Sequence, residues 1–259
     1  VSRDADIVFL AVPHGKAMEL TAAFMDQNVR VVDLSADFRL RDPQLYEDWY
    51  NEKHKHPDLL KQAVYGIPEL YGPEIARAGL IANPGCYPTS VILAMYPALQ
   101  GGYIAGKIVA DSKSGVSGAG RSASVGTLFC EVADSFKAYN TAKHRHTPEM
   151  EQELSRAVNN PVALSFSPHL VPMSRGILST CYADLAGKAK EAEIREFYKS
   201  FYKDHPWVRI MPQGRLPETR WVKGTMYCDL GLVVDQRTDT LVVVSCIDNL
   251  CRGASGQAV

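Results

Sequence analysis

The sequence predicts an α/β domain with a parallel sheet, followed by an α+β domain with a mixed or antiparallel sheet. Up to residue 82 the hydrophobic pattern alternates between strand and helix. Beyond residue 86 most of the predicted elements are strands, and the last two, joined across "QRTD", form an antiparallel hairpin. We therefore expect a first domain over residues 1–82 and a second over residues 83–259.

A β-α-β pattern opens the first domain. The near-continuous apolar run "DADIVFLAV" predicts a buried strand, and the turn Pro13-His14-Gly15 leads into a helix whose apolar side chains share one side. Asp42 before Pro43 predicts a helix N-terminus, because proline is favoured in the first turn. The expected elements are a strand at 4–12, a helix at 16–28, a strand at 29–34, a helix at 43–53, a mobile polar segment at 53–62 and a strand at 79–82.

Both ends of the sequence have the pattern of a cut element. A strand as apolar as residues 4–12 is typical of the interior of a parallel sheet, yet only three residues precede it. The final "GASGQAV" resembles a helix start with no helix after it. We expect a chain that is truncated at both ends.

Strands dominate the second domain, and few helices interrupt them. In "EAEIREFYKSFYKDH" five apolar side chains recur at helical spacing, which predicts a stripe packed on the sheet. Thr147 and Pro148 predict the N-cap and the first residue of another helix. The expected strands are 107–111, 162–166, 176–185, 226–235 and 240–247.

Composition favours a small-molecule partner over nucleic acid or a membrane. The 259 residues are 46% hydrophobic, enough for a sizeable core, and the formal net charge is -1. The sequence has no apolar run long enough to span a bilayer, and its start lacks the pattern of a signal peptide. Six cysteines without a C-x-x-C pair predict neither disulfides nor a metal site. We expect reduced cysteines, a cytoplasmic location and no bound metal.

The stretch "NPGCYPT" places Cys86 between a predicted strand and a predicted apolar helix that ends near Leu99. Free N–H groups and the positive end of the helix dipole stabilise a thiolate there, and they lower the pKa of a thiol from its free value of about 8.5. Cys86 is therefore the candidate nucleophile, with a small buried side chain as the alternative. We interpret Cys228 and Cys246, which lie within apolar strands, as small buried side chains without a chemical role.

A thiolate nucleophile requires an acid/base partner, which is usually histidine. Among the seven histidines, His54 and His56 lie in a charged run and His205 ends a helix, so we discount these three. In "KHRHTPEMEQEL" the predicted start of a helix holds the imidazole of His146, with His144 beside it. A basic surface cluster is the alternative.

Two further stretches can bind an anion. In "SKSGVSGAGRSAS" three glycines let the backbone approach a ligand and Arg121 adds a positive charge, with a flexible loop as the alternative. This pattern matches none of the common phosphate-binding loops. In "DLSADFRL" Arg39 follows a strand, at the sheet edge where open α/β sheets bind ligands. A solvated loop arginine is the alternative there.

Several stretches together resemble the N-acetyl-gamma-glutamyl-phosphate reductases of arginine biosynthesis. They are, in order, "AVPHG", "DLSADFRL", "YGIPEL", "NPGCYPT", "SGVSGAGR", "AYNTAKHRHTPE", "PHLVPMSRGI" and "IDNL". The resemblance covers essentially the whole chain, and "PGCYPT" with "HRHTPE" is its most specific part. That family is related to aspartate-semialdehyde dehydrogenase, and the resemblance implies the remnant of a Rossmann-type domain followed by an α+β domain for catalysis and dimerisation. The family's first strand, its glycine-rich dinucleotide turn and its closing helix are missing here.

The resemblance also implies a reaction and roles for the residues. NADPH reduces N-acetyl-gamma-glutamyl phosphate to the 5-semialdehyde through a thioester on Cys86, with His146 as acid/base and His144 as the second choice. Arg39 aligns with an arginine that contacts phosphate in the related dehydrogenases. A homo-oligomer, either a dimer or a tetramer, is implied. The residues implied near NADPH are Ser117, Gly118, Ala119 and Gly120, with Pro13, His14 and Asn249 as further candidates.

Other functions stay open at this point. Within the family, a carrier-bound aminoadipyl phosphate is the alternative substrate. Outside it, a cysteine hydrolase can use Cys86 and a histidine, with the glycine loop as an oxyanion site. A non-enzymatic module for anion binding or dimerisation is the remaining alternative.

Overall fold

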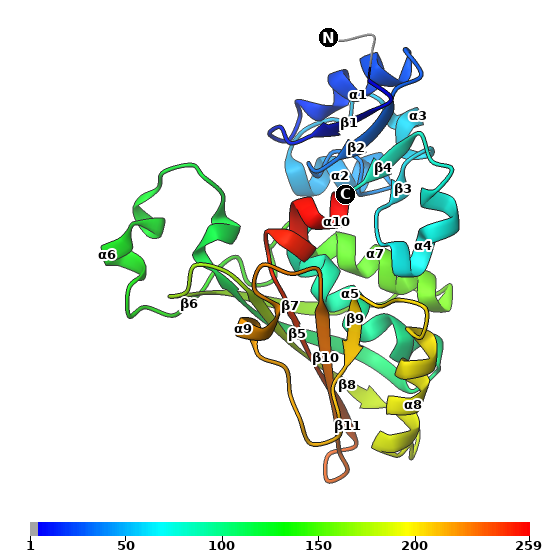
Figure 1. Cartoon of the computed structure of the whole chain (residues 1–259), viewed down its shortest axis with the longest axis vertical. Coiled ribbons are helices and arrows are strands. Elements are labelled where there is room, and N and C mark those ends of the chain that lie inside the picture. Colours follow the sequence, from blue (N-terminus) through cyan, green and yellow to red (C-terminus); the bar gives the residue numbers. More distant parts are fainter. Residues whose placement is uncertain (1–4) are drawn as a thin grey trace. The chain divides into compact units, whose positions relative to one another are not determined.

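The computed structural model describes residues 5–259, which fall into two compact units. Unit 1 contains the described residues up to Gly85 together with Ala254–Val259, and unit 2 contains Cys86–Gly253. Figure 1 labels the elements of both units. The expected second domain, 83–259, differs at its end, because residues 254–259 pack in unit 1. There the side-chain amide of Gln257 donates to the carbonyl of Gly66 at 2.7 Å.

Unit 1 is built on a four-stranded parallel sheet with the order β1-β2-β4-β3. This arrangement confirms the parallel α/β class expected for the first part of the chain. The strands are β1 (Ile7–Leu10), β2 (Arg30–Asp33), β3 (Val64–Tyr65) and β4 (Leu80–Ala82). The helices are α1 (Ala17–Met25), α2 (Pro43–Tyr50), α3 (Pro57–Leu60), α4 (Pro68–Ile75) and α10 (Gly256–Ala258).

Strand β1 lies at the edge of the described sheet. It pairs with β2 and has no described strand on its other side. Ile7 is 40% exposed and Phe9 is 44% exposed as a result. An apolar strand at the edge of the described sheet agrees with the expectation, drawn from the sequence, that this strand is typical of a sheet interior although only three residues precede it. Asp4, the expected first residue of this strand, lies outside the described residues.

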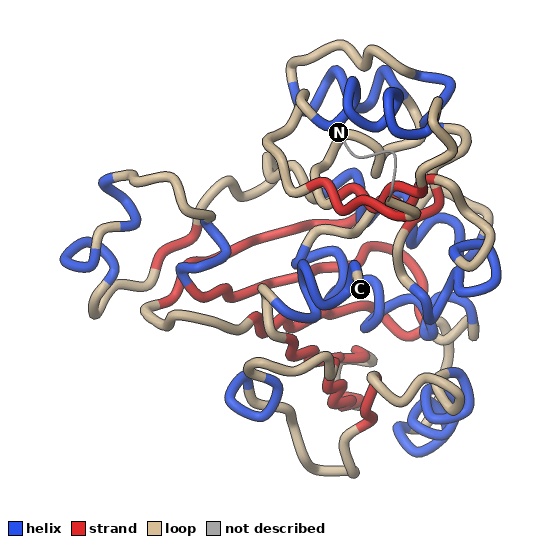
Figure 2. The backbone as a smooth tube through the Cα atoms, turned by 45° about the horizontal axis from the view of Figure 1, so that its top comes forward, coloured by secondary structure: helices blue, strands red, loops and turns tan. Residues whose placement is uncertain are grey.

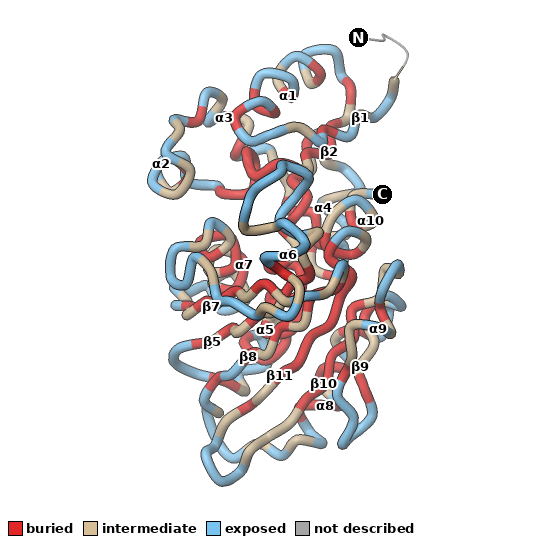
Figure 3. The backbone as a smooth tube through the Cα atoms, turned by 90° about the vertical axis from the view of Figure 1, so that its left-hand side faces the viewer, coloured by how far each residue is buried: buried red, intermediate tan, exposed pale blue. Residues whose placement is uncertain are grey.

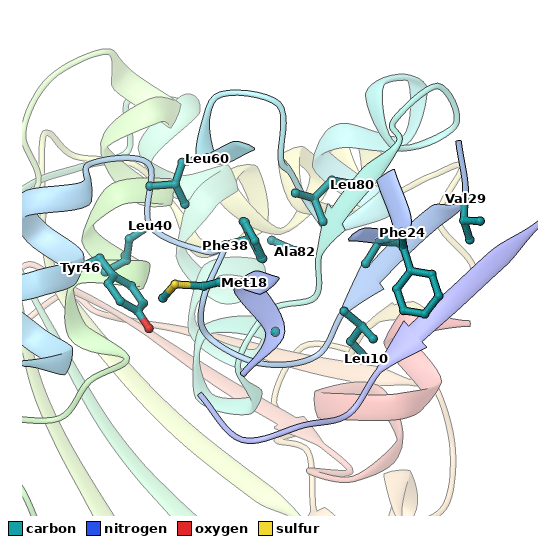
Figure 4. Close-up of a cluster of buried hydrophobic side chains, with 12 residues drawn as sticks. Leu10, Met18, Phe24, Val29, Phe38, Leu40, Tyr46, Leu60, Leu80 and Ala82 are labelled. Carbon is teal, nitrogen blue, oxygen red and sulfur yellow. The ribbon is translucent and has the colours of Figure 1, made fainter. Parts of the chain in front are cut away.

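Apolar side chains from the strands and helices of unit 1 share one core. Figure 4 shows Leu10 of β1, Met18 and Phe24 of α1 and Leu80 of β4, with Phe38 among them. Every one of these side chains is less than a tenth exposed. The burial of both strand and helix faces is what an α/β layer requires.

Asp37 caps the N-terminus of α1 from the loop after β2. Its buried carboxylate accepts hydrogen bonds from the N–H groups of Gly15 (2.9 Å) and Ala17 (3.2 Å) and from the hydroxyl of Tyr46 (2.8 Å). A carboxylate is stabilising at this end of a helix, because the free N–H groups carry partial positive charge. The N–H groups at the start of α1 are therefore hydrogen-bonded within unit 1.

The charged run at 53–62 is part of the folded unit and not the mobile polar segment that its composition predicts. Leu60 of α3 is 1% exposed and His54 is 4% exposed. The imidazole Nε2 of His54 lies 2.8 Å from the carbonyl oxygen of Asp37, and burial lowers the pKa of this histidine. Leu60 and His54 are buried in an otherwise polar stretch and anchor it to the unit. The average composition of the stretch does not indicate these two anchors.

Unit 2 is built on a seven-stranded mixed sheet with the order β6-β7-β5-β8-β11-β10-β9. The long strand β5 pairs parallel with β7 and antiparallel with β8, and β10 and β11 form the predicted antiparallel hairpin. The mixed sheet confirms the expected α+β class. The strands are β5 (Ile104–Gly115), β6 (Lys137–Ala138), β7 (Leu164–Val171), β8 (Ile177–Leu185), β9 (Val208–Ile210), β10 (Cys228–Asp235) and β11 (Thr240–Ile247).

Three helices cover one face of this sheet, as Figure 2 shows. They are α5 (Cys86–Gln100), α7 (Thr147–Val158) and α8 (Glu191–Phe201). Helix α5 contains Pro97, which has no N–H for the carbonyl of Leu93. The hydroxyl of Tyr202 donates to that carbonyl at 2.7 Å instead. The aromatic stripe predicted around α8 therefore supplies polar as well as apolar contacts to α5.

Short elements complete unit 2, and the last of them continues along the chain past the boundary at Gly253. They are η1 (Val116–Ala119), η2 (Val125–Thr127), α6 (Phe129–Val132), α9 (Thr219–Val222) and η3 (Cys251–Ser255). Across residues 5–259, none of the helices combines the length and the apolar character that a membrane span requires.

Asp33, at the end of β2, is a buried carboxyl group whose pKa is raised. Burial raises the pKa of Asp33 to about 6, although hydrogen bonds from the Ser35 hydroxyl (2.7 Å) and backbone N–H (2.9 Å) and the charge of Arg39 oppose the shift. An acid with a raised pKa in the folded state binds more protons folded than unfolded. Stability therefore falls as the pH rises from about 4 to about 6.

We predict that Asp33→Asn removes this pH dependence. At pH 4 Asp33 is largely protonated in the folded state, so the difference in unfolding free energy between variant and wild type should be smallest there. By pH 7 that difference should move in favour of the variant by up to about 3 kcal/mol, the value of a two-unit shift. Urea unfolding followed by circular dichroism at both pH values measures it, and a difference that does not change with pH would contradict the prediction.

Candidate active site

Cys86 is the first residue of α5, a half-buried cysteine that forms no disulfide. The N–H groups of the first helical turn favour its thiolate form. Other cysteines lie in settings that disfavour ionisation: burial raises the pKa of Cys181 to about 12, and it also raises the pKa of Cys246. Burial and the charge of Asp248 raise the pKa of Cys251. The helix-start position predicted from the sequence is thus present in the structure.

Tyr87, the residue after Cys86, connects the start of α5 to the two histidines. Its buried ring lies edge-on to the rings of His144 (5.5 Å between centroids) and His146 (6.1 Å). Its hydroxyl lies 3.0 Å from the hydroxyl of Tyr139, and burial is the main reason why the pKa of Tyr87 is raised. The structure therefore brings the cysteine motif and the histidine motif to one place in unit 2.

His144 is a neutral imidazole at physiological pH. Burial lowers its pKa to about 4, and the neighbouring charge of Arg145 acts in the same direction. The Nδ1 atom of His144 accepts a hydrogen bond from the backbone N–H of His146 at 3.1 Å, which assigns the ring proton to Nε2. The ring centroids of His144 and His146 lie 4.8 Å apart.

His146 occupies the cap position of α7, one residue before the position predicted from the sequence. The helix begins at Thr147, and no side-chain hydrogen bond caps it. His146 already has helical backbone angles (φ -81°, ψ -10°), and its carbonyl accepts the N–H of Met150 at 3.1 Å. A threonine inside the first turn cannot act as the cap, so the cap predicted for Thr147 is wrong. The main consequence predicted for the motif, an imidazole held at a helix start, is unchanged.

The glycine loop at 115–120 is closely packed along its first half. Its backbone bonds to the loop after β7, with the Ser117 N–H donating to the carbonyl of Ser174 at 3.2 Å. A Cβ on Gly115 would lie 2.8 Å from the backbone nitrogen of Arg175, and a Cβ on Gly118 would lie 2.8 Å from the hydroxyl of Ser114. These two glycines are therefore required for close packing.

Asn249 joins this loop from the end of β11. Its side-chain amide oxygen accepts the N–H of Gly176 at 2.7 Å, and its side-chain amide nitrogen donates to the hydroxyl of Ser117 at 3.0 Å. The structure thus brings Ser117, Gly118 and Asn249 together. Ala119, Gly120 and Arg121 follow at the exposed end of the loop, where the backbone is open to a ligand.

The remaining sequence candidates, Pro13, His14 and Arg39, lie in unit 1. His14 is exposed, and its Nδ1 accepts the N–H of Ala36 at 3.1 Å. Arg39 is 7% exposed, and its guanidinium donates to the carbonyls of Asn83 (2.8 Å) and Leu34 (2.9 Å). Arg39 is therefore not a solvated loop arginine, because its guanidinium holds the end of β4 in place.

Asp248 organises the turn that follows β11, and the sequence analysis did not single it out. Its carboxylate accepts hydrogen bonds from Arg175 (2.8 Å) and from the N–H groups of Gly224 (2.6 Å), Leu250 (2.8 Å) and Cys251 (2.8 Å). Burial alone would raise its pKa, but these donors hold the pKa below its usual value. The sequence feature that could have indicated this role is an aspartate directly after a buried strand, in "IDNL".

Gly253 ends this turn against Cys86. Its N–H donates to the carbonyl of Asp248 at 2.9 Å. A Cβ on Gly253 would lie 2.8 Å from the Cβ and 3.2 Å from the Cα of Cys86, closer than side chains approach. Only glycine fits here, and no local pattern in the sequence predicts this contact.

The described residues, 5–259, contain no group of three or more histidine, cysteine or acidic side chains arranged to hold a metal ion.

Comparisons with known proteins identify the two parts of the chain. The model of the family "Semialdehyde dehydrogenase, dimerisation domain" matches residues 86–249, and that of "Semialdehyde dehydrogenase, NAD binding domain" matches residues 1–78.

Curated relatives align over the whole chain. The N-acetyl-gamma-glutamyl-phosphate reductase of Pelotomaculum thermopropionicum is 54% identical, over 100% of this chain and 75% of its own. The enzyme of the same name from Desulfotalea psychrophila is 53% identical, over 98% of this chain and 74% of its own. The chain therefore spans about three quarters of the length of these relatives.

Solved structures share the fold at low identity. Aspartate semialdehyde dehydrogenase II from Vibrio cholerae covers 99% of this chain and 78% of its own with a TM-score of 0.71 and 16% identity. Aspartate semialdehyde dehydrogenase with NADP from Candida albicans covers 98% of this chain and 75% of its own with a TM-score of 0.63 and 14% identity.

We predict that Gly253→Ala displaces the thiol of Cys86 from the helix start. Alkylation of Cys86 by iodoacetamide at pH 7 should slow by roughly two- to fivefold, the factor that corresponds to the usual stabilisation of a charge at a helix end. Peptide mass spectrometry measures this rate. Gly187→Ala is the matched control, because a Cβ at Gly187 meets no atom within 4 Å. Equal alkylation rates in both variants would contradict the prediction.

Proposed function

The chain belongs to the N-acetyl-gamma-glutamyl-phosphate reductase family, and we propose that it reduces N-acetyl-gamma-glutamyl phosphate with NADPH to N-acetyl-glutamate 5-semialdehyde and phosphate. One observation of the structure carries this proposal. The first residue of a buried helix is a cysteine, and two histidines pack on the residue that follows it. This is the arrangement that acyl transfer to a cysteine requires.

Cys86 performs the acyl transfer. Its thiolate forms a bond to the acyl carbon, the bond from that carbon to the phosphate oxygen breaks, and phosphate leaves with the electron pair. Phosphate is a good leaving group, so this step requires little proton transfer. The product on the enzyme is a thioester of Cys86.

The exposed end of the glycine loop fits a nicotinamide cofactor. Gly118 leaves no room for a side chain beside Ser114, and from Gly118 to Gly120 the backbone is exposed. We assign Ser117 to Gly120 to the cofactor, with Asn249 holding the loop through Ser117. NADPH, when bound, supplies the hydride for reduction of the thioester.

The two histidines divide the remaining chemistry. Because His144 stays neutral and carries its ring proton on Nε2, it can donate a hydrogen bond to an oxyanion. His146, held at the start of α7, is the acid/base that exchanges a proton as the aldehyde is released.

Arginine and unit 1 residues have supporting roles. We assign Arg121, at the exposed end of the glycine loop, to the substrate phosphate. Arg39 acts as a positioning residue, because its guanidinium holds the carbonyl of Asn83. Pro13 and His14 stay candidates for contact with the cofactor. Because the N–H groups of Gly15 and Ala17 already donate to Asp37, Pro13 and His14 would contact the cofactor through their side chains.

The alternatives from the sequence are less favoured. The relatives named above are reductases of acetyl-glutamyl phosphate by name, which disfavours both the aminoadipyl substrate and a cysteine hydrolase. The match to a dimerisation domain supports a homo-oligomer, for which we propose a dimer or tetramer. Six free cysteines favour a reducing compartment, so we propose a cytoplasmic location.

The reverse reaction tests this function. Mixed with N-acetyl-glutamate 5-semialdehyde and NADP, the chain should produce NADPH only when phosphate is added, as followed by nicotinamide absorbance. Cys86→Ser should lower the rate by about 10³-fold or more, because the nucleophile is lost. Cys130→Ser, which changes an exposed cysteine outside the site, is the control. Reduction of NADP without phosphate, or an active Cys86→Ser, would overturn the proposal.

A further prediction separates the two histidines. His146→Asn should lower turnover by about 10²- to 10⁴-fold, the usual contribution of acid/base catalysis, and Cys86 should still form a thioester that mass spectrometry detects. His144→Asn should be milder, because an amide can also donate a hydrogen bond. If His144→Asn abolishes turnover and His146→Asn does not, the two roles are reversed. If neither matters, the acid lies outside the motif.

A further inference from the structure

Two tyrosine hydroxyls meet near Cys86, and the chemistry proposed above uses neither of them. Tyr87 is the second residue of α5, a helix that is buried along most of its length, as Figure 3 shows. Tyr139 follows β6, and its backbone N–H donates to the carbonyl of Pro168 in β7 at 3.1 Å. The two hydroxyl oxygens lie 3.0 Å apart. A buried helix and a paired strand therefore hold the two phenol groups together.

Both hydroxyls keep their protons at neutral pH. Burial raises the pKa of Tyr139 to about 12, and burial also raises the pKa of Tyr87. The charge of Cys86 contributes to the rise in pKa at both residues, so both hydroxyls are near enough to Cys86 for its charge to act on them. A neutral phenol interacts with an anion by donating a hydrogen bond to it.

The geometry of the pair indicates which proton is available to a ligand. The hydroxyl of Tyr87 can donate to the oxygen of Tyr139 at 3.0 Å or to the carbonyl of His169 at 3.3 Å. Only the first distance lies within the usual range of O–H···O bonds, about 2.5 to 3.0 Å. Tyr87 therefore donates to Tyr139, and the proton of Tyr139 is left for another acceptor. Tyr139 is also the more accessible of the two, since it is half-buried and Tyr87 is buried.

His144 supplies another donor at the same place. Its ring lies edge-on to the ring of Tyr139 with 5.7 Å between centroids, as it does to the ring of Tyr87. Its neutral imidazole carries the Nε2 proton that can bond to an oxyanion. Enzymes that transfer acyl groups aim fixed donors at the oxyanion, and a tyrosine hydroxyl is one of the groups that serve there.

We propose that the hydroxyl of Tyr139 is a second donor to the oxyanion formed at Cys86, together with His144, and that Tyr87 is the positioning residue that orients this hydroxyl. The proposal rests on the acyl transfer of the proposed function and deepens it. When the thiolate bonds to the acyl carbon, one electron pair of the C=O double bond moves to the oxygen, and it returns when phosphate leaves. Reduction of the thioester places charge on the same oxygen again, so the same two donors serve both steps.

The first experiment compares two reactions of the Cys86 thiol. With p-nitrophenyl acetate the thiolate adds to the ester carbon, an oxyanion forms and p-nitrophenolate leaves, which absorbance follows, with Cys86→Ser as the background. With iodoacetamide the thiolate displaces iodide at a saturated carbon, and no oxyanion forms. Tyr139→Phe should slow the acylation by about 10- to 10²-fold and the alkylation by less than about threefold. Equal slowing of both reactions, or of neither, is incompatible with the proposal.

A second experiment tests Tyr87 through its effect on Tyr139. Tyr87→Phe keeps the ring on which the histidines pack and removes only the hydroxyl, so acylation should slow by about three- to tenfold. In the double variant Tyr87→Phe/Tyr139→Phe acylation should be no slower than in Tyr139→Phe alone, because a positioning residue has no effect once the group that it orients is gone. Losses that multiply in the double variant would show that Tyr87 acts independently, against the proposal.

Tyr198→Phe is the matched control. Its hydroxyl is also buried and also bonds at α5, where it donates to the carbonyl of Ala94 at 2.6 Å, but it comes from α8. Its loss should lower the free energy of unfolding and leave both reactions of Cys86 within about twofold of the wild type. If acylation slows in this control as much as in Tyr139→Phe, the effect belongs to any buried hydroxyl at α5 and the proposal fails.

Turnover separates this proposal from the proposed function. The reaction with p-nitrophenyl acetate requires neither NADP nor the semialdehyde, so it decides the role of Tyr139 even if the reductase assignment is wrong. If that assignment holds, Tyr139→Phe lowers kcat of the reverse reaction by about 10- to 10²-fold and leaves KM within about threefold, because the hydrogen bond strengthens only as charge develops. A raised KM with an unchanged kcat would place the hydroxyl on the bound substrate and not on the oxyanion, and would overturn the inference.

Discussion

The burial of α5 is the constraint on which the site depends. Between Tyr87 and Leu99 every residue except Tyr96 is buried, so this helix has sheet and helices around it and cannot turn or shift without opening the core. Such a helix must satisfy its polar groups inside the protein. Ser90 meets Ser179 of β8 at 2.6 Å, and Ser179 meets Ser112 of β5 at 2.7 Å. These contacts fix α5 on the sheet, and with it the position of the thiol at its first residue.

The same constraint explains why the close contacts around Cys86 are made by small or backbone groups. Because Cys86 is the first residue of a helix buried on most sides, the groups that contact it must reach it from other parts of the chain or follow it directly in sequence. Gly253 does so by having no side chain, and the carboxylate of Asp248 holds the turn that places Gly253 there. Tyr87 lies beside Cys86 because it is the next residue in the sequence, and both histidines pack on its ring.

Features that depend on neighbouring residues in the chain could be predicted from the sequence. The cap of α2 is one, since Asp42 accepts the N–H of Gln44 at 2.8 Å as its place before Pro43 predicts. The β10–β11 hairpin and the helix start at Cys86 are others. In each case the pattern and its physical cause lie within a few residues.

Features that depend on distant residues could not be predicted. The contact of Gly253 with Cys86 and the bond between the Tyr87 and Tyr139 hydroxyls join positions far apart in the chain. The sequence placed Arg39 at a strand end, the usual position of a ligand-binding arginine, but it did not show that the guanidinium donates to the carbonyls of Asn83 and Leu34. The burial of His144 is a further case: the sequence places it beside His146, and the ring centroids lie 4.8 Å apart, but the pattern does not show that packing lowers the pKa of this imidazole to about 4. Burial keeps His144 neutral, so two adjacent histidines can perform different tasks even though their sequence context is nearly the same.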